Sequence, residues 1–95
     1  MPCIGVLTLD LRIEDARSLK DKRHVVQGLK ERLRHKFNVA VAEIDCQELW
    51  QRAVVAAVTV SADRVYASQL LEAVEKEAAA LLGAVLVGAD VEWLE

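Results

Sequence analysis

The stretch CIGVLTLDLRIEDARSLKDKRHVVQGLKERLRHKF, residues 3–37, changes its hydrophobic period once along its length. Up to Ile13, apolar residues fall on alternate positions, which is typical of a strand with one buried face. From Leu19 onward they recur at helical spacing. Ser18, with Asp21 three residues later, resembles the capping box that begins many helices. The stretch therefore predicts a strand over 3–13 and then an amphipathic helix that starts at Leu19.

The remainder of the chain predicts a second helix and three more strands. Asp63 is a candidate N-cap for that helix, and Gly83 is placed to end it. The further elements are, in chain order, strands over 38–45 and 52–61, a helix over 64–82 and a strand over 84–95. Between the middle strands, CQELWQ can form a short helical turn. Two βαβ halves of this size predict one ferredoxin-like α+β domain over residues 1–95, a four-stranded antiparallel sheet with both helices on one face.

The composition leaves apolar surface beyond what one core needs. The chain has 95 residues and is 54% hydrophobic, which is rich for a soluble domain. The sheet face away from the helices would carry Ile4, Val6 and Thr8, with Ala and Val residues of the middle strands. A face of this kind is poorly suited to water. We therefore expect a homodimer that buries this face or an adjacent edge. The alternative is that loops and the CQELWQ turn cover it.

Positive charge is concentrated in one part of an acidic chain. The formal net charge is −3, yet residues 12–36 hold nine Lys and Arg against four acids, and the rest holds three against eleven. This balance excludes a general polyanion binder, because the acidic remainder repels DNA and RNA. It permits a single basic face. The aromatic share of 4% also weighs against single-stranded nucleic-acid modules, which stack bases on exposed rings.

The first predicted helix carries the candidate binding residues. Lys20, Arg23, Gln27, Lys30 and Arg34 fall within about 80° of one another on a helical wheel, beside the apolar stripe. Arg17 and Lys22 are expected to support this row. Such a row can contact successive phosphates of RNA, or it can be a solvated flank whose long stems cover the edge of the core. Glu31 lies outside the row, so the row contains no acidic residue that would neutralise its positive charges.

The start of the same helix is a second candidate site for an anion. Ser18, Lys20, Lys22 and Arg23 surround backbone N–H groups that the helix leaves unpaired. Acylphosphatases share the expected fold and bind phosphate in the loop after the first strand. Here that loop is IEDARS, which is acidic and has no glycine-rich cradle. An acylphosphatase-like enzyme is therefore rejected.

No group of residues predicts catalysis, a metal or another cofactor. Cys3 and Cys46 do not form a paired zinc motif, and His24 and His35 are eleven residues apart on one helix. We expect small buried thiols and surface histidines. The chain is therefore expected to be a non-enzymatic binding protein.

Three further side chains interrupt the apolar pattern in an informative way. Glu43 falls inside an apolar strand and is expected to pair with Arg52 across the hairpin. Trp50 and Trp93 are expected to anchor the edges of the core or of an interface rather than to stack on bases.

Two segments carry a resemblance to a known family. SLKDKR at 18–23 and KFNVAVAE at 36–43, followed by a strand such as RAVVAAVTVSAD, resemble the YlxP-like family of small bacterial proteins of unknown function. The resemblance covers essentially the entire chain. It implies a ferredoxin-like fold and a gene neighbourhood with transcription-elongation, translation-initiation and ribosome-maturation factors. It implies no catalytic residues.

Structured RNA or a ribosomal particle is the partner we expect for the basic helix. The alternative is a homodimeric module that binds an acidic protein surface or a small anionic ligand. The first residues lack the positive region and the small-residue cleavage site of a signal peptide. No apolar run reaches the length of a membrane span. A cytoplasmic protein without a membrane partner is therefore expected.

Overall fold

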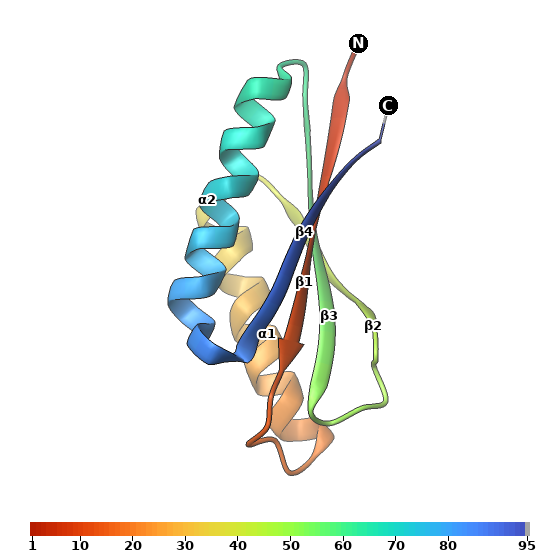
Figure 1. The fold of residues 1–95 in the computed structure, drawn as a ribbon, viewed down its shortest axis with the longest axis vertical. Helices are drawn as coiled ribbons and strands as arrows, with labels where there is room; N and C mark the ends of the chain where they lie inside the picture. The colour runs from red at the N-terminus through yellow and green to blue at the C-terminus, as the bar shows by residue number, and fades with distance from the viewer. Residues whose placement is uncertain (95) are drawn as a thin grey trace.

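The computed structural model describes residues 1–94, and its elements follow the predicted order (Figure 1). The elements are β1 (Cys3–Arg12), α1 (Leu19–Lys36), β2 (Ala40–Asp45), β3 (Arg52–Ser61), α2 (Arg64–Leu82), a 3₁₀ turn (Gly83–Val85) and β4 (Leu86–Leu94). The strands form one antiparallel sheet in the order β2-β3-β1-β4. Both helices lie on the same face of that sheet (Figure 1). The predicted ferredoxin-like α+β fold is confirmed.

The predicted helix caps are confirmed by their hydrogen bonds. The Ser18 hydroxyl accepts from the Asp21 N–H at 3.1 Å, and the Asp21 carboxylate accepts from the Arg17 N–H at 2.8 Å. The Asp63 carboxylate accepts from the backbone N–H groups of Val65 and Tyr66. The bonds to Ser18 and Asp63 satisfy N–H groups that the first turn of each helix leaves free, and the bond from Arg17 completes the first cap.

Three predicted boundaries and one predicted turn differ from the structure. β1 ends at Arg12 rather than at Ile13. β2 begins at Ala40 rather than at Asn38, because a tight turn closed by the Val39 N–H and the Phe37 carbonyl (3.0 Å) follows α1. β4 begins at Leu86, because Gly83 at φ 57° leads into the 3₁₀ turn. The CQELWQ segment is a single turn in which the Leu49 N–H donates to the Cys46 carbonyl, so the predicted helical turn is wrong. The predicted strand end at Glu95 lies outside the described residues.

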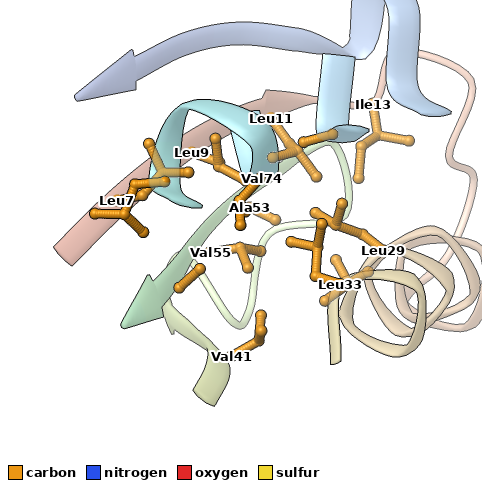
Figure 2. Close-up of a cluster of buried hydrophobic side chains, with 14 of the residues drawn as sticks. Leu7, Leu9, Leu11, Ile13, Leu29, Leu33, Val41, Ala53, Val55 and Val74 are labelled. Carbon is orange, nitrogen blue, oxygen red and sulfur yellow. The ribbon is translucent and has the colours of Figure 1, made fainter. Parts of the chain in front are cut away.

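The core lies between the sheet and the two helices. β1 supplies Leu7, Leu9 and Leu11, which are fully buried, and the alternate positions face the other way. Figure 2 shows these leucines in one apolar cluster with Leu29 and Leu33 of α1 and with smaller side chains of β3 and α2. α1 covers β2 and β3, whereas α2 covers β1, β3 and β4. Burial of this apolar surface is the main force that holds the helices on the sheet.

The face of the sheet that the helices leave uncovered is largely apolar. The strand registers place Ile4, Val6 and Thr8 of β1 on it, beside Val60, Val58 and Ala56 of β3. Ala40 and Ala42 continue the same rows on β2, and Asp90 and Glu92 of β4 lie at the opposite edge. We call this surface the open face. Neither loops nor the 46–51 segment bury it, since Ile4 and Val60 are exposed.

Gly5 permits the closest approach between β1 and its neighbours. A Cβ atom at this position would lie 2.7 Å from the Leu71 side chain and 2.7 Å from the Trp93 ring. Gly28 lies in the middle of α1 and would meet nothing within 4 Å. The two glycines therefore offer a matched pair of substitutions.

Replacing Gly5 by Ala should lower the free energy of unfolding by about 1–3 kcal/mol, because the added methyl overpacks the Trp93 contact. Gly28→Ala should raise it by up to about 1 kcal/mol, because Ala favours a helix interior. Urea unfolding followed by circular dichroism measures both. Equal stability of Gly5→Ala and the parent would contradict the packing of Trp93 on β1.

Candidate nucleic-acid interface

The predicted basic row lies on the flank of α1 that faces away from α2. Lys20, Arg23 and Arg34 are exposed and Lys30 is half-buried. On a helix these positions share one side, about a quarter turn from the buried Val26, Leu29 and Leu33. Within residues 1–94, none of these four cations forms an ion pair. We call Lys20, Arg23, Lys30 and Arg34 the basic row.

The opposite flank of α1 is also basic, but its two cations share a carboxylate partner. Arg32 and Lys36 each approach the Glu77 carboxylate of α2 at 2.8 Å. The hydrogen bonds from Lys36 and Arg32 hold the pKa of Glu77 below its ordinary value, so the carboxylate stays ionised. These two cations join the helices to each other. Unlike the cations of the basic row, Arg32 and Lys36 therefore have a carboxylate partner.

Two other side chains border the basic row. Gln27, which the wheel places within it, donates from Nε2 to the Glu31 carboxylate at 3.3 Å. Glu31 thus lies beside the row, although it does not pair with any of its cations. Arg17 is exposed in the loop before α1, where its N–H completes the helix cap. Arg17 is therefore free to extend the row beyond the start of the helix.

Lys22 does not belong to the exposed surface, and the prediction that it supports the row is wrong. Its side chain is only 1% exposed. The ammonium nitrogen lies 2.6 Å from the Cys46 carbonyl, 3.2 Å from that of Gln47 and 3.1 Å from that of Arg52. It also lies 2.9 Å from Oε2 of Glu43. A phosphate cannot reach a cation enclosed in this way.

The Lys22 ammonium uses all of its hydrogen-bonding capacity. A lysine has three N–H donors, and the three carbonyls account for them. Oε2 of Glu43 is buried and has no hydrogen-bond partner, although it is 2.9 Å from the nitrogen. Glu43 therefore neutralises the buried charge. Together the four groups satisfy a cation that would otherwise be costly to bury.

The expected pair between Glu43 and Arg52 is wrong. Glu43 is in register with Val55, on the face of the sheet that the helices cover. Arg52 is in register with Arg12 on the other face, where it approaches Asp10 at 3.4 Å. The contacts with Asp10 raise the pKa of Arg52 further above its ordinary value. Alternation along the strands thus separates Glu43 from Arg52.

The two tryptophans have different environments. Trp93 packs against the core and lies 4.5 Å below the guanidinium of Arg64, so its predicted role as an anchor is confirmed. Trp50 lies in the 46–51 loop, is 52% exposed and is not part of the core. It adjoins a hollow at the end of the sheet that is also lined by Arg12 and Arg52. The sequence analysis missed both this hollow and the burial of Lys22.

Other chemistry finds little support in the described residues. Cys3 and Cys46 are both free, and Cys3 is buried with its thiol directed at the Ser61 carbonyl. Across residues 1–94, no three His, Cys, Asp or Glu side chains gather closely enough to hold a metal ion. Neither described helix is long and apolar enough to span a membrane.

The family of the chain follows from its sequence along nearly its full length. A family model described as a protein of unknown function, DUF503, matches residues 4–91. The chain belongs to the DUF503 family. A curated relative of this DUF503 chain, uncharacterized protein YlxP of Bacillus subtilis (strain 168), is 39% identical over 71 residues, which cover 75% of the chain and 77% of the relative. The resemblance expected from the SLKDKR and KFNVAVAE segments is confirmed.

Solved structures share the fold of the DUF503 chain at low sequence identity. The designed protein Foldit4 matches all of the chain with a TM-score of 0.62 and 14% identity, and 98% of that protein is covered. A putative antibiotic biosynthesis monooxygenase from Bordetella bronchiseptica matches with a TM-score of 0.52 and 15% identity, with 97% of it covered. At such identities the likeness concerns the fold alone.

Replacing Lys22 by Met should lower the free energy of unfolding by about 3–5 kcal/mol, because it leaves Glu43 and three carbonyls without their cation. Lys20→Met, on the exposed side of the same turn, should change it by less than about 0.5 kcal/mol. Urea unfolding measures both, with Lys22→Met/Glu43→Gln expected to recover part of the loss. Equal stability of the two single variants would contradict the enclosure of Lys22.

Proposed function

We propose that this protein binds structured RNA through the basic row of α1. One observation carries the proposal: four cations on one flank of α1 form no ion pair within residues 1–94, while Arg32 and Lys36 on the other flank both pair with Glu77. Cations without carboxylate partners are available to displace the counterions of a phosphate backbone. Contacts of this kind fix the position of a protein on RNA without reading its sequence.

The length and direction of the row suit a helical RNA backbone. From Lys20 to Arg34 the helix rises about 21 Å at 1.5 Å per residue. The row is straight because α1 is held along its length by buried side chains from Lys22 to Leu33. Arg17 can add a contact beyond the N-terminal end. Double-stranded RNA is recognised mainly by its shape and its phosphates, which a straight row of cations can follow.

The charge of the rest of the protein gives the contact an orientation. The acidic residues outside 12–36 include Asp90 and Glu92, which lie at the β4 edge, whereas α1 covers the β2 side of the sheet. Repulsion from this acidic side would leave the α1 flank as the one that approaches a polyanion. The ribosome-linked gene neighbourhood that the family resemblance implies is consistent with such a partner.

Reversing two charges of the row tests the proposal against a matched control. Arg23→Glu/Arg34→Glu should weaken binding to a ribosomal RNA helix by about tenfold for each lost phosphate contact at 0.1 M salt, and reduce the salt slope. Arg32→Glu/Lys36→Glu makes the same change in net charge on the opposite flank and should have a much smaller effect. Filter binding over a salt series measures both.

No binding by the parent protein at low salt would overturn the proposal, as would equal effects of the two double variants. A partner that remains attached to the purified protein after nuclease treatment would instead favour the alternative, in which the row meets an acidic protein surface.

We also propose that a second copy of the chain covers the open face. The open face is apolar over β1, β2 and β3, and Val60 at its end is 61% exposed. The strands have 10, 6, 10 and 9 residues. At about 3.3 Å per residue and about 4.8 Å between strands, the whole face presents about 550 Å². Two such faces would bury about 1,100 Å² in total, which is near the lower limit for a stable interface between proteins.

Placing a charge on the open face should separate the two copies. Val60→Glu puts a carboxylate into the proposed interface, where its desolvation is costly, so the protein should sediment as a monomer. Val65→Glu on α2 is the control, because Val65 is similarly exposed at 66% but lies on the helix layer. Sedimentation velocity measures the mass. A parent protein that is monomeric at all concentrations tested would contradict the proposal.

A further inference from the structure

The loop between β2 and β3 is held rigidly at its first half by Lys22. The ammonium donates to the carbonyls of Cys46 and Gln47 at the start of the loop and to that of Arg52 just beyond its end. The Leu49 N–H closes the turn by donating to the Cys46 carbonyl at 3.0 Å. A side chain from α1 thus fixes both ends of a loop that is more than twenty residues away in the chain.

The second half of the loop is fastened to the segment between β1 and α1. The Gln51 side-chain amide donates to the carbonyls of Glu14 and Ala16 at 3.0 and 3.1 Å. In return, the Gln51 carbonyl accepts from the Ile13 N–H at 2.9 Å. The loop therefore does not move freely between the strands. Its backbone is determined before any partner arrives.

This ordered loop presents apolar side chains to solvent. Leu49 and Trp50 are each about half exposed, and neither belongs to the core. Trp is the side chain with the largest apolar area, so leaving it in water is unfavourable. Because the backbone that carries the ring is already fixed, the entropic cost of ordering this loop on binding is small. Rigid support of an exposed ring is typical of a binding platform.

The ring adjoins a hollow that contains charges of both signs. The hollow is an open depression with a volume of about 690 Å³. Arg12 and Arg52 line it from the end of the sheet, and Glu14, Glu48 and Leu49 complete its walls with Trp50. Arg12 forms no ion pair within residues 1–94, whereas Arg52 forms an ion pair with Asp10.

We propose that this hollow holds an unpaired base of the bound RNA, stacked on Trp50. The inference rests on the proposed function and adds a second contact to it. Stacking on an aromatic ring is the general way in which proteins hold single-stranded bases. The guanidinium of Arg12, assisted by Arg52, would bind the phosphate that flanks the base. The carboxylates of Glu14 and Glu48 would accept hydrogen bonds from exocyclic amino groups, which favours adenine or cytosine over uracil.

The hollow and the basic row can meet one RNA molecule. α1 begins at the end of the molecule where the β2–β3 loop lies (Figure 1). Lys22, between Lys20 and Arg23 in sequence, makes the contacts with that loop. A helical RNA segment along the row could therefore place a bulge or loop base at Trp50. The occupant we infer is a base next to a helix, rather than an isolated single strand.

The fluorescence of Trp50 provides a direct test, because the chain has two tryptophans. Trp93→Phe leaves Trp50 as the only reporter, and Trp50→Phe leaves Trp93 as the control. An RNA hairpin with an adenine-rich loop should quench Trp50 and leave Trp93 unchanged, since Trp93 packs on the core. The same hairpin with a uridine loop should quench less. A blunt RNA duplex of equal length should not quench Trp50.

Affinity separates this inference from the proposed function. Trp50→Ala should weaken binding of the adenine-loop hairpin by about tenfold, while binding of the duplex and the salt slope stay unchanged. If RNA binds through the basic row but Trp50 is neither quenched nor needed, the inference is overturned and the proposed function stands. If no RNA binds, both fall. A Trp50 signal that follows protein concentration and not RNA would show that a second copy fills the hollow, which also overturns the inference.

Discussion

The buried ammonium of Lys22 is the contact on which the remaining parts of the surface depend. It joins α1 to Glu43 of β2 and to three carbonyls around the β2–β3 loop. A buried cation of this kind must keep all of its partners, because losing one leaves a charge or a carbonyl unsatisfied in the interior. α1 therefore cannot rotate about its axis. The direction of the basic row and the position of Trp50 follow from the same four contacts.

The two flanks of α1 show how similar residues take different tasks. Arg32 and Lys36 form ion pairs with Glu77 and so link α1 to α2. The four cations of the basic row form no ion pair with a carboxylate in the described chain. The difference arises from the position of α2, which lies on one side of α1 only. In this acidic protein, one flank of the basic helix α1 stabilises the packing against α2, and the other flank is exposed to solvent. Net charge alone cannot distinguish the two.

Much of the fold could be predicted because the apolar residues that carry its periodicity are the ones that become buried. Leu7, Leu9 and Leu11 mark β1, and Leu29 and Leu33 mark α1. The start of β4 could not be predicted, since a 3₁₀ turn and a bulge next to Asp10 and Leu11 change the register there. Such local departures depend on how neighbouring strands pair.

The burial of Lys22 did leave a trace in the sequence. On the helical wheel its position falls between those of Leu29 and Leu33, inside the apolar stripe. Glu43 likewise interrupts an apolar strand, so two misplaced charges of opposite sign indicate a pair. Choosing Arg52 as the partner failed because it lies on the other face of the sheet. The hollow at Trp50 left no such trace, because it is formed by segments that meet only after folding.

The inward carboxylate of Glu43 has a further consequence for solubility. β2 is an edge strand, and its free backbone groups could pair with the strand of another molecule and start aggregation. A further strand added at this edge would lie beside the Lys22–Glu43 pair, and burying these charges more deeply would cost desolvation energy. An inward charge on an edge strand is a known obstacle to such growth. The interaction that holds α1 in place also protects the β2 edge of the sheet.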